Sequence, residues 1–557
     1  MEYGGKIMPA VSAYQRSPLV NLAYTPLSDA AVHTDGIQRQ LTQLALNLVD
    51  THRLPVLDAV LATKLGGYTE EPACSMPDPA QVKENTAAYL ESLRAKAMVS
   101  AMTRDKQGML DALSGLKSFH AALPELSEET LFCVGADALR LIVDLYRRTG
   151  QSFLLSLLEN LRSRLPDVSG VMHMFPFQRA YRPDSAAHTP DEEAYYARMQ
   201  RFATGKLMAD ALAMTALLSQ YSGSGRDAAA PRTGLSALMR YHGMPSGVFS
   251  ADPYLAGRDP ARAAELAAVC AQAEACLDAL LATGDVAMAD GLERIAKNVL
   301  PDLLSERGVR TLSPTNRLAD DDSCQWQQPA REDTSALLRA LYAPRRAVWL
   351  AKDDSRLCYM LPLAGGCLTR MNGVPVRLTA AVSGVWQQEI AVKVECKQPV
   401  SFTLDLHVPG YADAARVSVN GGRAQNAVPG ELCAVTHNFQ TGDVVTLQLD
   451  LSPRVQTGYR GSVSVYAGAQ LLALPLPVAD AAWRYALLAG ESRAAAEENG
   501  RPVALMTACE APAWQERAGF ILPPPQGVAV GPAYELTLVP AAGMDGRIAA
   551  FPCAVER

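Results

Sequence analysis

The feature that most constrains the fold is a change in hydrophobic period near residue 345. Before this point, apolar residues recur at the spacing of amphipathic helices. After it, apolar and polar residues alternate as in half-buried strands. All five tryptophans lie from residue 326 onward. The pattern predicts a large helical domain followed by β-sandwich domains.

Very short connections separate neighbouring helical segments in the first part. One segment ends at Thr149-Gly150 and the next begins at Phe153, and the same pattern recurs around Thr283-Gly284. A glycine in the left-handed conformation can end one helix, and a polar residue can cap its successor. Connections this short make consecutive helices antiparallel. Such hairpins build a closed toroid or a solenoid, and the lack of a fixed repeat length favours the toroid, with a ligand expected in its funnel.

The second part shows strict alternation over 402–408 and 445–451, with Asn-Gly hairpin signals at 372–373 and 420–421. We expect a last strand at 534–539, and we expect this strand to return to the first sandwich. The domains expected from these patterns are a helical domain over 1–345, a β-sandwich over 346–472 plus 531–557, and a smaller β module inserted at 473–530.

Composition argues against several classes of partner. The formal net charge is −7 and no Lys/Arg run is long enough to follow a phosphate backbone, which argues against nucleic acid. The first residues lack the pattern of a signal peptide, and no apolar segment is expected to cross a membrane. Eleven cysteines without framework spacing indicate reduced thiols, so we expect a cytoplasmic protein.

Several motifs resemble glycoside hydrolase family 127, the β-L-arabinofuranosidases. The matching segments are 247–254, 264–270, 283–285 and 292–301 in the helical part, and 404–412, 417–421, 442–449 and 534–540 in the strand part. They cover roughly the C-terminal half in the family's order. The resemblance implies an (α/α)6 barrel followed by antiparallel β-sandwich modules, and a carbohydrate ligand. We also consider a homodimer through the β-sandwich region.

The family's catalytic motif is only partly present. Members similar to this chain hold Zn²⁺ with one Glu and three Cys, one of which is the nucleophile. The resemblance places the ligand Glu at Glu265, but Ala267 and Ser323 stand where two of the cysteines are expected. Only Glu265 and Cys324 remain as metal ligands, whereas a tetrahedral zinc site needs four. We therefore expect no zinc cofactor of the usual kind.

Other catalytic positions of the family are also replaced. The acid/base Glu is expected after Gly247, where this chain has Val248 and Phe249. Two expected Gly-His pairs end instead in Ala136 and Lys206. A serine hydroxyl at the nucleophile position would need a neighbouring base to react. The usual thiolate mechanism therefore cannot be transferred to this chain.

Glu265 and Asp252 are the candidate catalytic pair, because a carboxylic acid in a funnel can protonate a leaving group when burial raises its pKa. Each also has a simpler interpretation. Glu265 at a helix start interacts favourably with the helix dipole. Asp252 before Pro253 is typical of a turn.

The candidate substrate-binding residues are His173, Tyr254, Trp326 and Ser323. His173 lies in an aromatic stretch typical of sugar subsites, and a packed structural histidine fits the sequence equally well. Cys324 is either a metal ligand or a small apolar packing residue.

Two functions of different classes follow. The leading hypothesis is a glycosidase that acts on a small oligosaccharide or glycoconjugate without the zinc-thiolate nucleophile. The alternative is a catalytically inactive paralogue that binds sugar or a partner subunit, since several catalytic positions are replaced together. A purely structural scaffold would instead have a plugged funnel.

Overall fold

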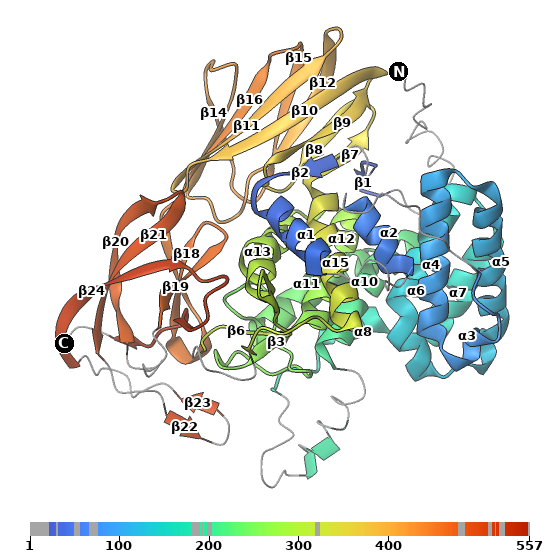
Figure 1. Ribbon diagram of the computed structural model, residues 1–557, viewed down its shortest axis with the longest axis horizontal. Coiled ribbons are helices and arrows are strands. Elements are labelled where there is room, and N and C mark those ends of the chain that lie inside the picture. The colour runs from blue at the N-terminus through green and yellow to red at the C-terminus, as the bar shows by residue number, and fades with distance from the viewer. Residues whose placement is uncertain are drawn as a thin grey trace.

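The computed structural model describes residues 22–28, 32–48, 56–65, 76–180, 190–191, 193–194, 197, 203–317, 324–476, 485–510, 515–517, 520–522 and 530–554. Helices fill one side of the molecule and three main sheets occupy the other (Figure 1). The described α-helices all begin before residue 332, and strands dominate from Trp349 onward. The change of period near residue 345 therefore marks the observed change of secondary structure.

Six helices of the described chain form a closed ring, in which each contacts the next and the last contacts the first. In ring order these are α2 (Val56–Lys64), α4 (Thr86–Thr103), α6 (Glu128–Thr149), α10 (Gly205–Ser222), α12 (Leu266–Thr283) and α15 (Arg331–Val348). Further helices pack against this ring, namely α1 (Gly36–Leu48), α3 (Gln81–Glu84), α5 (Lys106–Ala122), α7 (Phe153–Arg164), α8 (Val168–Met174), α11 (Gly225–His242) and α13 (Ala287–Arg294). A π-helical turn (Ile295–Val299) and α14 (Leu300–Leu303) continue from α13.

The helix ends follow the expected chemistry. Ser127 caps α6 by accepting a hydrogen bond from the Thr130 amide. Gly150 and Gly284 end α6 and α12 with φ of 67° and 76°, which is the left-handed region where glycine is favoured. The short connections after these glycines turn the chain back along the ring, as the sequence predicts.

Helix α12 is the most apolar element of the ring. By length and composition alone it could cross a bilayer, contrary to the expectation from the sequence, but 72% of it is buried inside the protein. A core helix with neighbours on all sides has no need of a polar face. Its apolar length therefore reflects its place in the ring.

Two sheets follow the ring and share one core with it. Sheet A has the order β1-β7-β8-β12-β15 and sheet B the order β14-β13-β16-β11-β10-β9-β2. Their strands are β1 (Thr25–Pro26), β2 (Val32–Thr34), β7 (Trp349–Asp353), β8 (Arg356–Tyr359), β9 (Gly365–Met371), β10 (Val374–Ser383), β11 (Gln387–Cys396), β12 (Val400–His407), β13 (Ala414–Val419), β14 (Gln425–Ala427), β15 (Leu432–Phe439) and β16 (Val444–Asp450). The N-terminal strands β1 and β2, which the sequence did not indicate, attach the beginning of the chain to both sheets.

A third sheet, sheet C, has the order β17-β18-β19-β24-β21-β20-β26, with β25 paired to β19. Its strands are β17 (Pro453–Thr457), β18 (Val463–Ala467), β19 (Gln470–Pro475), β20 (Tyr485–Glu498), β21 (Arg501–Glu510), β24 (Val530–Pro540), β25 (Arg547–Ile548) and β26 (Cys553–Ala554). Small two-stranded pairs are β3 (Ala263–Glu265) with β6 (Leu312–Pro314), β4 (Leu304–Ser305) with β5 (Gly308–Val309), and β22 (Gln515–Arg517) with β23 (Phe520–Leu522).

Strand β24 pairs with strands on both sides of the expected domain boundary. We expected 534–539 to return to the first sandwich, placed at 346–472. Pro540 pairs with Leu472 of β19 at the end of that range, while Leu538 pairs with Ala504 of β21 in the expected insertion. Alternation reveals a strand without revealing its partner. Strands from both sides of the expected insertion therefore lie in one sheet.

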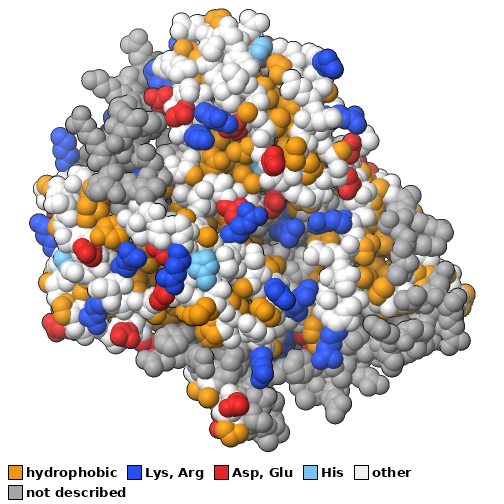
Figure 2. Space-filling model, turned by 180° about the vertical axis from the view of Figure 1, so that it is seen from behind, with side chains coloured by type: hydrophobic (Ala, Val, Ile, Leu, Met, Phe, Trp, Pro, Cys, Tyr) orange, Lys and Arg blue, Asp and Glu red, His pale blue; other side chains and the backbone are white. Residues whose placement is uncertain are grey.

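The largest core joins the ring to sheets A and B. Trp349 is fully buried where α15 continues into β7, and its ring lies 4.7 Å from that of Tyr359 in β8. Sheet C has a separate core that includes Leu472, Leu538 and Phe551. On the surface seen in Figure 2, basic and acidic side chains are interspersed with apolar ones.

Candidate functional site

Asp252 and Glu265 come together at the N-terminal end of α12. Ala251 forms a parallel bridge with Ala264, and the Glu265 amide donates a hydrogen bond to the Ala251 carbonyl at 3.0 Å. Glu265 ends β3 and is the N-cap residue of α12, but its side chain makes no capping hydrogen bond. The helix-cap interpretation of this carboxyl group therefore lacks its usual contact.

The two carboxyl groups have different surroundings. Burial raises the pKa of Glu265, and the nearby charges of Asp252 and Asp333 raise it further. Burial also raises the pKa of Asp252, but the guanidinium of Arg262, at 2.9 Å, opposes this shift. Glu265 has no salt bridge to any described residue. Arg262 thus favours the ionised form of Asp252, whereas no cation is named among the causes of the raised pKa of Glu265.

Tyr254 lies beside this pair. Its backbone bridges Thr204 at the start of α10, and its carbonyl accepts a hydrogen bond from the Asp252 amide at 3.2 Å. The Gly205 amide donates to the carbonyl of Pro253 at 3.0 Å. The segment 251–254 thus holds the candidate acid, the candidate tyrosine and the N-terminus of a ring helix close together.

His173 and Trp326 make other contacts. The exposed His173 ring lies 2.9 Å from the Arg226 carbonyl at the start of α11. Trp326 donates its indole N–H to Asp545 at 3.1 Å, and the Arg310 guanidinium lies 3.8 Å from the ring centre. Within the described chain, neither residue has a contact that joins it to the carboxylate pair. Trp326 instead connects the segment before α15 to the loop before β25.

The expected metal ligands are not assembled in the part of the chain that the structure describes. No group of three or more His, Cys, Asp and Glu residues there is arranged to hold a metal ion. Cys324 is buried, and its carbonyl accepts a hydrogen bond from Arg310 at 2.7 Å. Ser323 lies outside the described residues. Burial raises the pKa of Cys270 and Cys276 in α12, which disfavours the thiolate that zinc requires. These donors do not fit a zinc-thiolate centre.

Apolar or paired side chains occupy the other replaced positions. Val248 and Phe249, where the acid/base Glu was expected, are 0% and 1% exposed. Lys206, in place of an expected histidine, forms a 2.6 Å ion pair with Asp210 one turn further along α10. The Lys-x-x-x-Asp spacing on a helix could have indicated this pair from the sequence.

An ion-pair network inside the ring was not expected. Arg94 contacts Asp137 at 2.9 Å and Glu274 at 3.3 Å. Arg140 contacts the same two acids and also Asp278, at 2.7 Å. The network lies between ring helices α4, α6 and α12, so its members are far apart in sequence. Only the ring closure brings them together.

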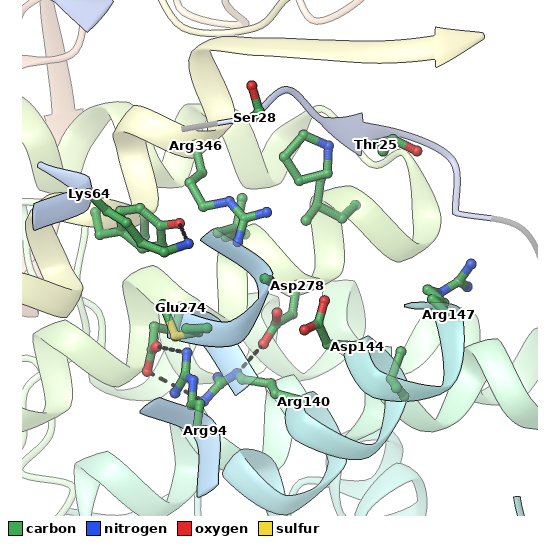
Figure 3. Close-up of a pocket in the computed structure, with 18 of the residues that line it drawn as sticks. Thr25, Ser28, Lys64, Arg94, Arg140, Asp144, Arg147, Glu274, Asp278 and Arg346 are labelled. Atoms are coloured by element: carbon green, nitrogen blue, oxygen red, sulfur yellow. Dashed lines mark hydrogen bonds and ion pairs between the residues drawn. The ribbon is translucent and has the colours of Figure 1, made fainter. Parts of the chain in front are cut away.

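A cavity of about 970 Å³ opens beside this network, at the C-terminal half of α12 (Figure 3). Its lining includes Glu274, Asp278 and several arginines, but neither Asp252 nor Glu265. About nine residues of α12 separate Glu265 from Glu274, the first residue of this helix in the lining, which corresponds to about 14 Å along a helix. The cavity is therefore a second location, distinct from the carboxylate pair.

Comparisons with known proteins relate this chain to β-L-arabinofuranosidases. Residues 364–451 match the family described as "Beta-L-arabinofuranosidase, GH127 middle domain". No curated protein matches the sequence. The resemblance seen in the sequence is thus confirmed for the segment that forms sheet B and part of sheet A.

Solved structures share the fold over almost the whole chain. A structure described as a glycoside hydrolase is 15% identical, with a TM-score of 0.71, and the match covers 96% of this chain and 98% of that one. A GH127 β-arabinofuranosidase is 14% identical, with a TM-score of 0.63 and coverage of 96% and 100%. A GH127 β-L-arabinofuranosidase from Geobacillus stearothermophilus T6 is 14% identical, with a TM-score of 0.62 and coverage of 94% and 91%. At these identities the matches establish a common fold.

Proposed function

Because the chain is a GH127-like protein, we propose that it hydrolyses a glycosidic bond in a small oligosaccharide or glycoconjugate with the carboxyl groups of Asp252 and Glu265. The observation that carries the proposal is the placement of these two groups side by side at the N-terminal end of α12, with both pKa values raised. A pair of carboxyl groups is sufficient for glycoside hydrolysis without a metal.

The surroundings suggest a role for each member. Glu265 has no cationic partner in the described chain and sits near two other acids, so it is suited to donate a proton to the leaving oxygen. Asp252 is held by Arg262, which favours its ionised form, so it is suited to act as nucleophile or as base toward water. We propose that Tyr254, whose carbonyl accepts a hydrogen bond from the Asp252 amide, contacts the sugar beside them.

The same proposal includes the architecture. We infer that the ring of six helices with its outer partners is an (α/α)6 barrel, with the sugar at the end formed by helix N-termini. Sheets A and B, which share one core, form the first β-sandwich. The proposal keeps a helical domain over 1–345 and a β-sandwich from 346; α15 ends at Val348 and β7 begins at Trp349.

The test is a screen of 4-nitrophenyl furanosides and pyranosides with the purified protein, before and after treatment with a chelator. We expect turnover that the chelator leaves unchanged, and a loss of about 10²–10⁴-fold in kcat for Glu265→Gln or Asp252→Asn. Glu129→Gln, at the start of ring helix α6, is the matched control and is expected to keep full activity. Cys324→Ala is also expected to remain active. Activity that needs zinc and disappears in Cys324→Ala would contradict the proposal.

The alternative is an inactive paralogue that binds sugar or a partner subunit. It is favoured by the fully buried Val248 and Phe249 and by the Lys206–Asp210 pair, because these fill or neutralise positions where the family keeps catalytic groups. Calorimetric titration with the same sugars distinguishes the two functions. Binding without turnover, unaffected by Glu265→Gln, would select the inactive paralogue.

A further inference from the structure

The segment 245–249, which leads to Asp252, is held by side chains of the ring, the π-helical turn and sheet C. Three consecutive backbone carbonyls of this segment each accept a hydrogen bond from a different element. The pairs are Tyr466 of β18 with Pro245 at 3.0 Å, Asn298 of the π-helical turn with Ser246 at 3.2 Å, and Gln272 of α12 with Gly247 at 3.2 Å. All three donor side chains are buried, so the segment is held from three directions inside the protein.

Asn298 binds on two sides at once. Its amide group donates to the Ser246 carbonyl and, at 2.9 Å, to the carbonyl of Ala469 in the turn between β18 and β19. Its side-chain oxygen accepts a hydrogen bond from the Leu471 amide of β19, also at 2.9 Å. A carboxamide has two N–H donors and one carbonyl oxygen, so both donors and the acceptor have partners. Asn298 therefore ties the 245–249 segment directly to sheet C.

The helix geometry at Asn298 is unusual. Ile295–Val299 form a π-helical turn between α13 and α14. Such turns are rare, and they occur frequently at functional sites. Asparagine is also a weak helix former, because its side chain competes for backbone hydrogen bonds. Neither feature strengthens the helix itself, which indicates that the contacts of Asn298 beyond the helix are what this turn provides.

Gln272 extends the hold on the segment toward the carboxylate pair. Its side chain donates to the Gly247 carbonyl and accepts from the Phe249 amide at 3.3 Å. Gln272 lies about two helical turns after Glu265, the N-cap residue of α12. One helix thus carries the first carboxyl group and holds the segment that leads to the second, Asp252.

Main-chain hydrogen bonds complete the connection to Asp252. The Ser250 amide donates to the carbonyl of His242, and the Ala251 amide donates to the carbonyl of Ala263, both at 2.8 Å. Closely packed and hydrogen-bonded interiors transmit strain instead of absorbing it locally. A displacement at the start of the segment therefore reaches Asp252.

A purely structural role explains only part of these contacts. A second buried asparagine, Asn316, also ties the helical half to sheet C, since its amide donates to the Ala550 carbonyl at 2.7 Å and accepts from the Ala549 and Ala550 amides. Its side chain makes no hydrogen bond to residues 245–252 within the described chain. Joining the two parts of the molecule therefore does not need the additional hydrogen bond that Asn298 makes to this segment.

We propose that Asn298 is a positioning residue for the Asp252 carboxyl group, because it fixes the segment that leads to Asp252 between sheet C and the ring. Sheet C then takes part in the geometry of the carboxylate pair, although neither proposed catalytic residue lies in it. This inference rests on the proposed glycosidase function. A misplacement of about 1 Å at a reacting group can cost about 10²-fold in rate.

Steady-state kinetics of the full chain test the proposal, with the 4-nitrophenyl glycoside that is turned over fastest as substrate. Asn298→Ala is expected to lower kcat by about tenfold or more and to change KM by less than about threefold, since a reacting group is misplaced while the groups that bind substrate remain. Asn316→Ala is the matched control because it also removes three hydrogen bonds to sheet C. It is expected to lower thermal stability by a similar amount and to leave kcat unchanged. The same kcat in both variants would overturn the proposal.

The pH profile of kcat distinguishes positioning from a loss of stability. Arg262, at 2.9 Å from Asp252, favours the ionised carboxylate that the proposed mechanism needs. A loosened segment weakens this contact, so the acid limb of the kcat profile is expected to move to higher pH in Asn298→Ala. An acid limb at the same pH in Asn298→Ala and Asn316→Ala would count against a positioning role and overturn the inference.

Hydrogen exchange of the amides in 245–255, followed by mass spectrometry, separates this inference from the proposed function because it needs no turnover. We expect faster exchange of this segment in Asn298→Ala than in Asn316→Ala. An unchanged protein without turnover would contradict the proposed function, and exchange alone would then decide whether Asn298 holds the segment. Equal exchange rates in the two variants overturn the inference whether or not the protein is active.

A milder variant serves if Asn298→Ala does not fold. Tyr466→Phe keeps the ring and removes only the hydroxyl that donates to the Pro245 carbonyl. It is expected to lower kcat by about threefold, in keeping with the loss of one neutral hydrogen bond, and to speed exchange in the same segment. Unchanged kcat and unchanged exchange in Tyr466→Phe would show that the segment is not positioned from sheet C.

Discussion

At the scale of single residues, the environment of Glu265 connects stability with function. Burial and the negative charges of Asp252 and Asp333 raise its pKa in the folded protein. A carboxyl group with a raised folded pKa stabilises the fold below its unfolded pKa, and this contribution is lost as the pH rises through the folded value. At neutral pH this side chain is therefore a cost to the fold that a purely structural residue would not impose.

A pH series of thermal unfolding measures this cost. Glu265→Gln is expected to unfold at a higher temperature than the unchanged protein at pH 7, with the difference shrinking toward pH 4. In the unchanged protein, kcat should fall on the alkaline side of its pH profile, since the proton donor Glu265 must be protonated to act. If Glu265→Gln changed the unfolding temperature equally at pH 7 and pH 4, the pKa of the Glu265 carboxyl group would not be raised in the folded protein.

Asp302 is a buried acid whose pKa is shifted in the opposite direction to that of Glu265. It is fully buried and accepts hydrogen bonds from Arg317 at 2.8 Å and Arg547 at 2.7 Å, while Arg310 lies at 3.7 Å. These guanidinium groups hold the pKa of Asp302 well below its usual range. Through Arg547 of β25 the acid therefore joins α14 to sheet C, while Arg310 and Arg317 come from the segment that follows α14.

Asp302→Asn is expected to lower the free energy of unfolding by about 3–5 kcal/mol, because it leaves buried guanidinium groups without a counter-charge. Chemical denaturation monitored by circular dichroism measures the change. Asp545→Asn, at a partly exposed acid that contacts Arg307 and Arg310, is the comparison and should cost less. A loss below about 1 kcal/mol for Asp302→Asn would contradict this account.

At the scale of elements, four ring helices, α4, α6, α10 and α12, end at a residue in the left-handed conformation. Gly150 has a φ of 67°, and an added Cβ would meet no other atom within 4 Å. Gly150→Ala is therefore expected to destabilise by about 1–2 kcal/mol through backbone strain alone. Gly225→Ala, at the start of α11 where there is equal space and no positive φ, should be neutral or slightly stabilising. Equal unfolding midpoints for the two variants would contradict the strain argument.

These glycines also show which parts of the fold can be predicted from sequence. Helix periods, left-handed ends and Asn-Gly turns are local, so α6, α12 and the strands around Asn372 and Asn420 follow from short segments. Strand partners are not local. The pairing of β24 with β19 and the attachment of β1 to β7 depend on contacts between segments far apart in the chain, and no local pattern encodes them.

The candidate site divides in the same way. Asp252 and Glu265 lie on segments that the sequence related to one functional region, and the structure brings them together through the Ala251–Ala264 bridge. The arginines of the cavity come from separate helices at unrelated positions, some within a helix and others at its end. Only the parallel arrangement of the ring helices places them around one space.

At the scale of the whole molecule, the ring has two unlike ends. The positive ends of its helix dipoles lie on the side of Asp252, Glu265 and Asp333, and the negative ends lie on the side of the basic cavity. Charges of the favourable sign can thus gather at each end without destabilising the ring.

The ring is also joined to sheets A and B by buried polar contacts. Tyr411, which follows β12, donates its hydroxyl to Glu293 of α13 at 2.7 Å, and Lys297 contacts the same carboxylate at 2.5 Å. The Glu293 carboxylate is fully buried, so the loss of one donor leaves part of a charge unsatisfied. This contact lies at the edge of the core that the ring shares with both sheets.

Tyr411→Phe is expected to destabilise that shared unit by about 1.5–3 kcal/mol, the usual range for a hydrogen bond to a charged group. Tyr221→Phe in α10 removes a hydroxyl that makes no hydrogen bond within the described chain, and it should leave stability unchanged.

Differential scanning calorimetry distinguishes two views of the molecule. If the ring and sheets A and B unfold as one unit through their common core, Tyr411→Phe lowers a single large transition, while the transition of sheet C, which has its own core, moves less. Two separately shifting transitions for the ring and for sheets A and B would show that the contact joins independent domains.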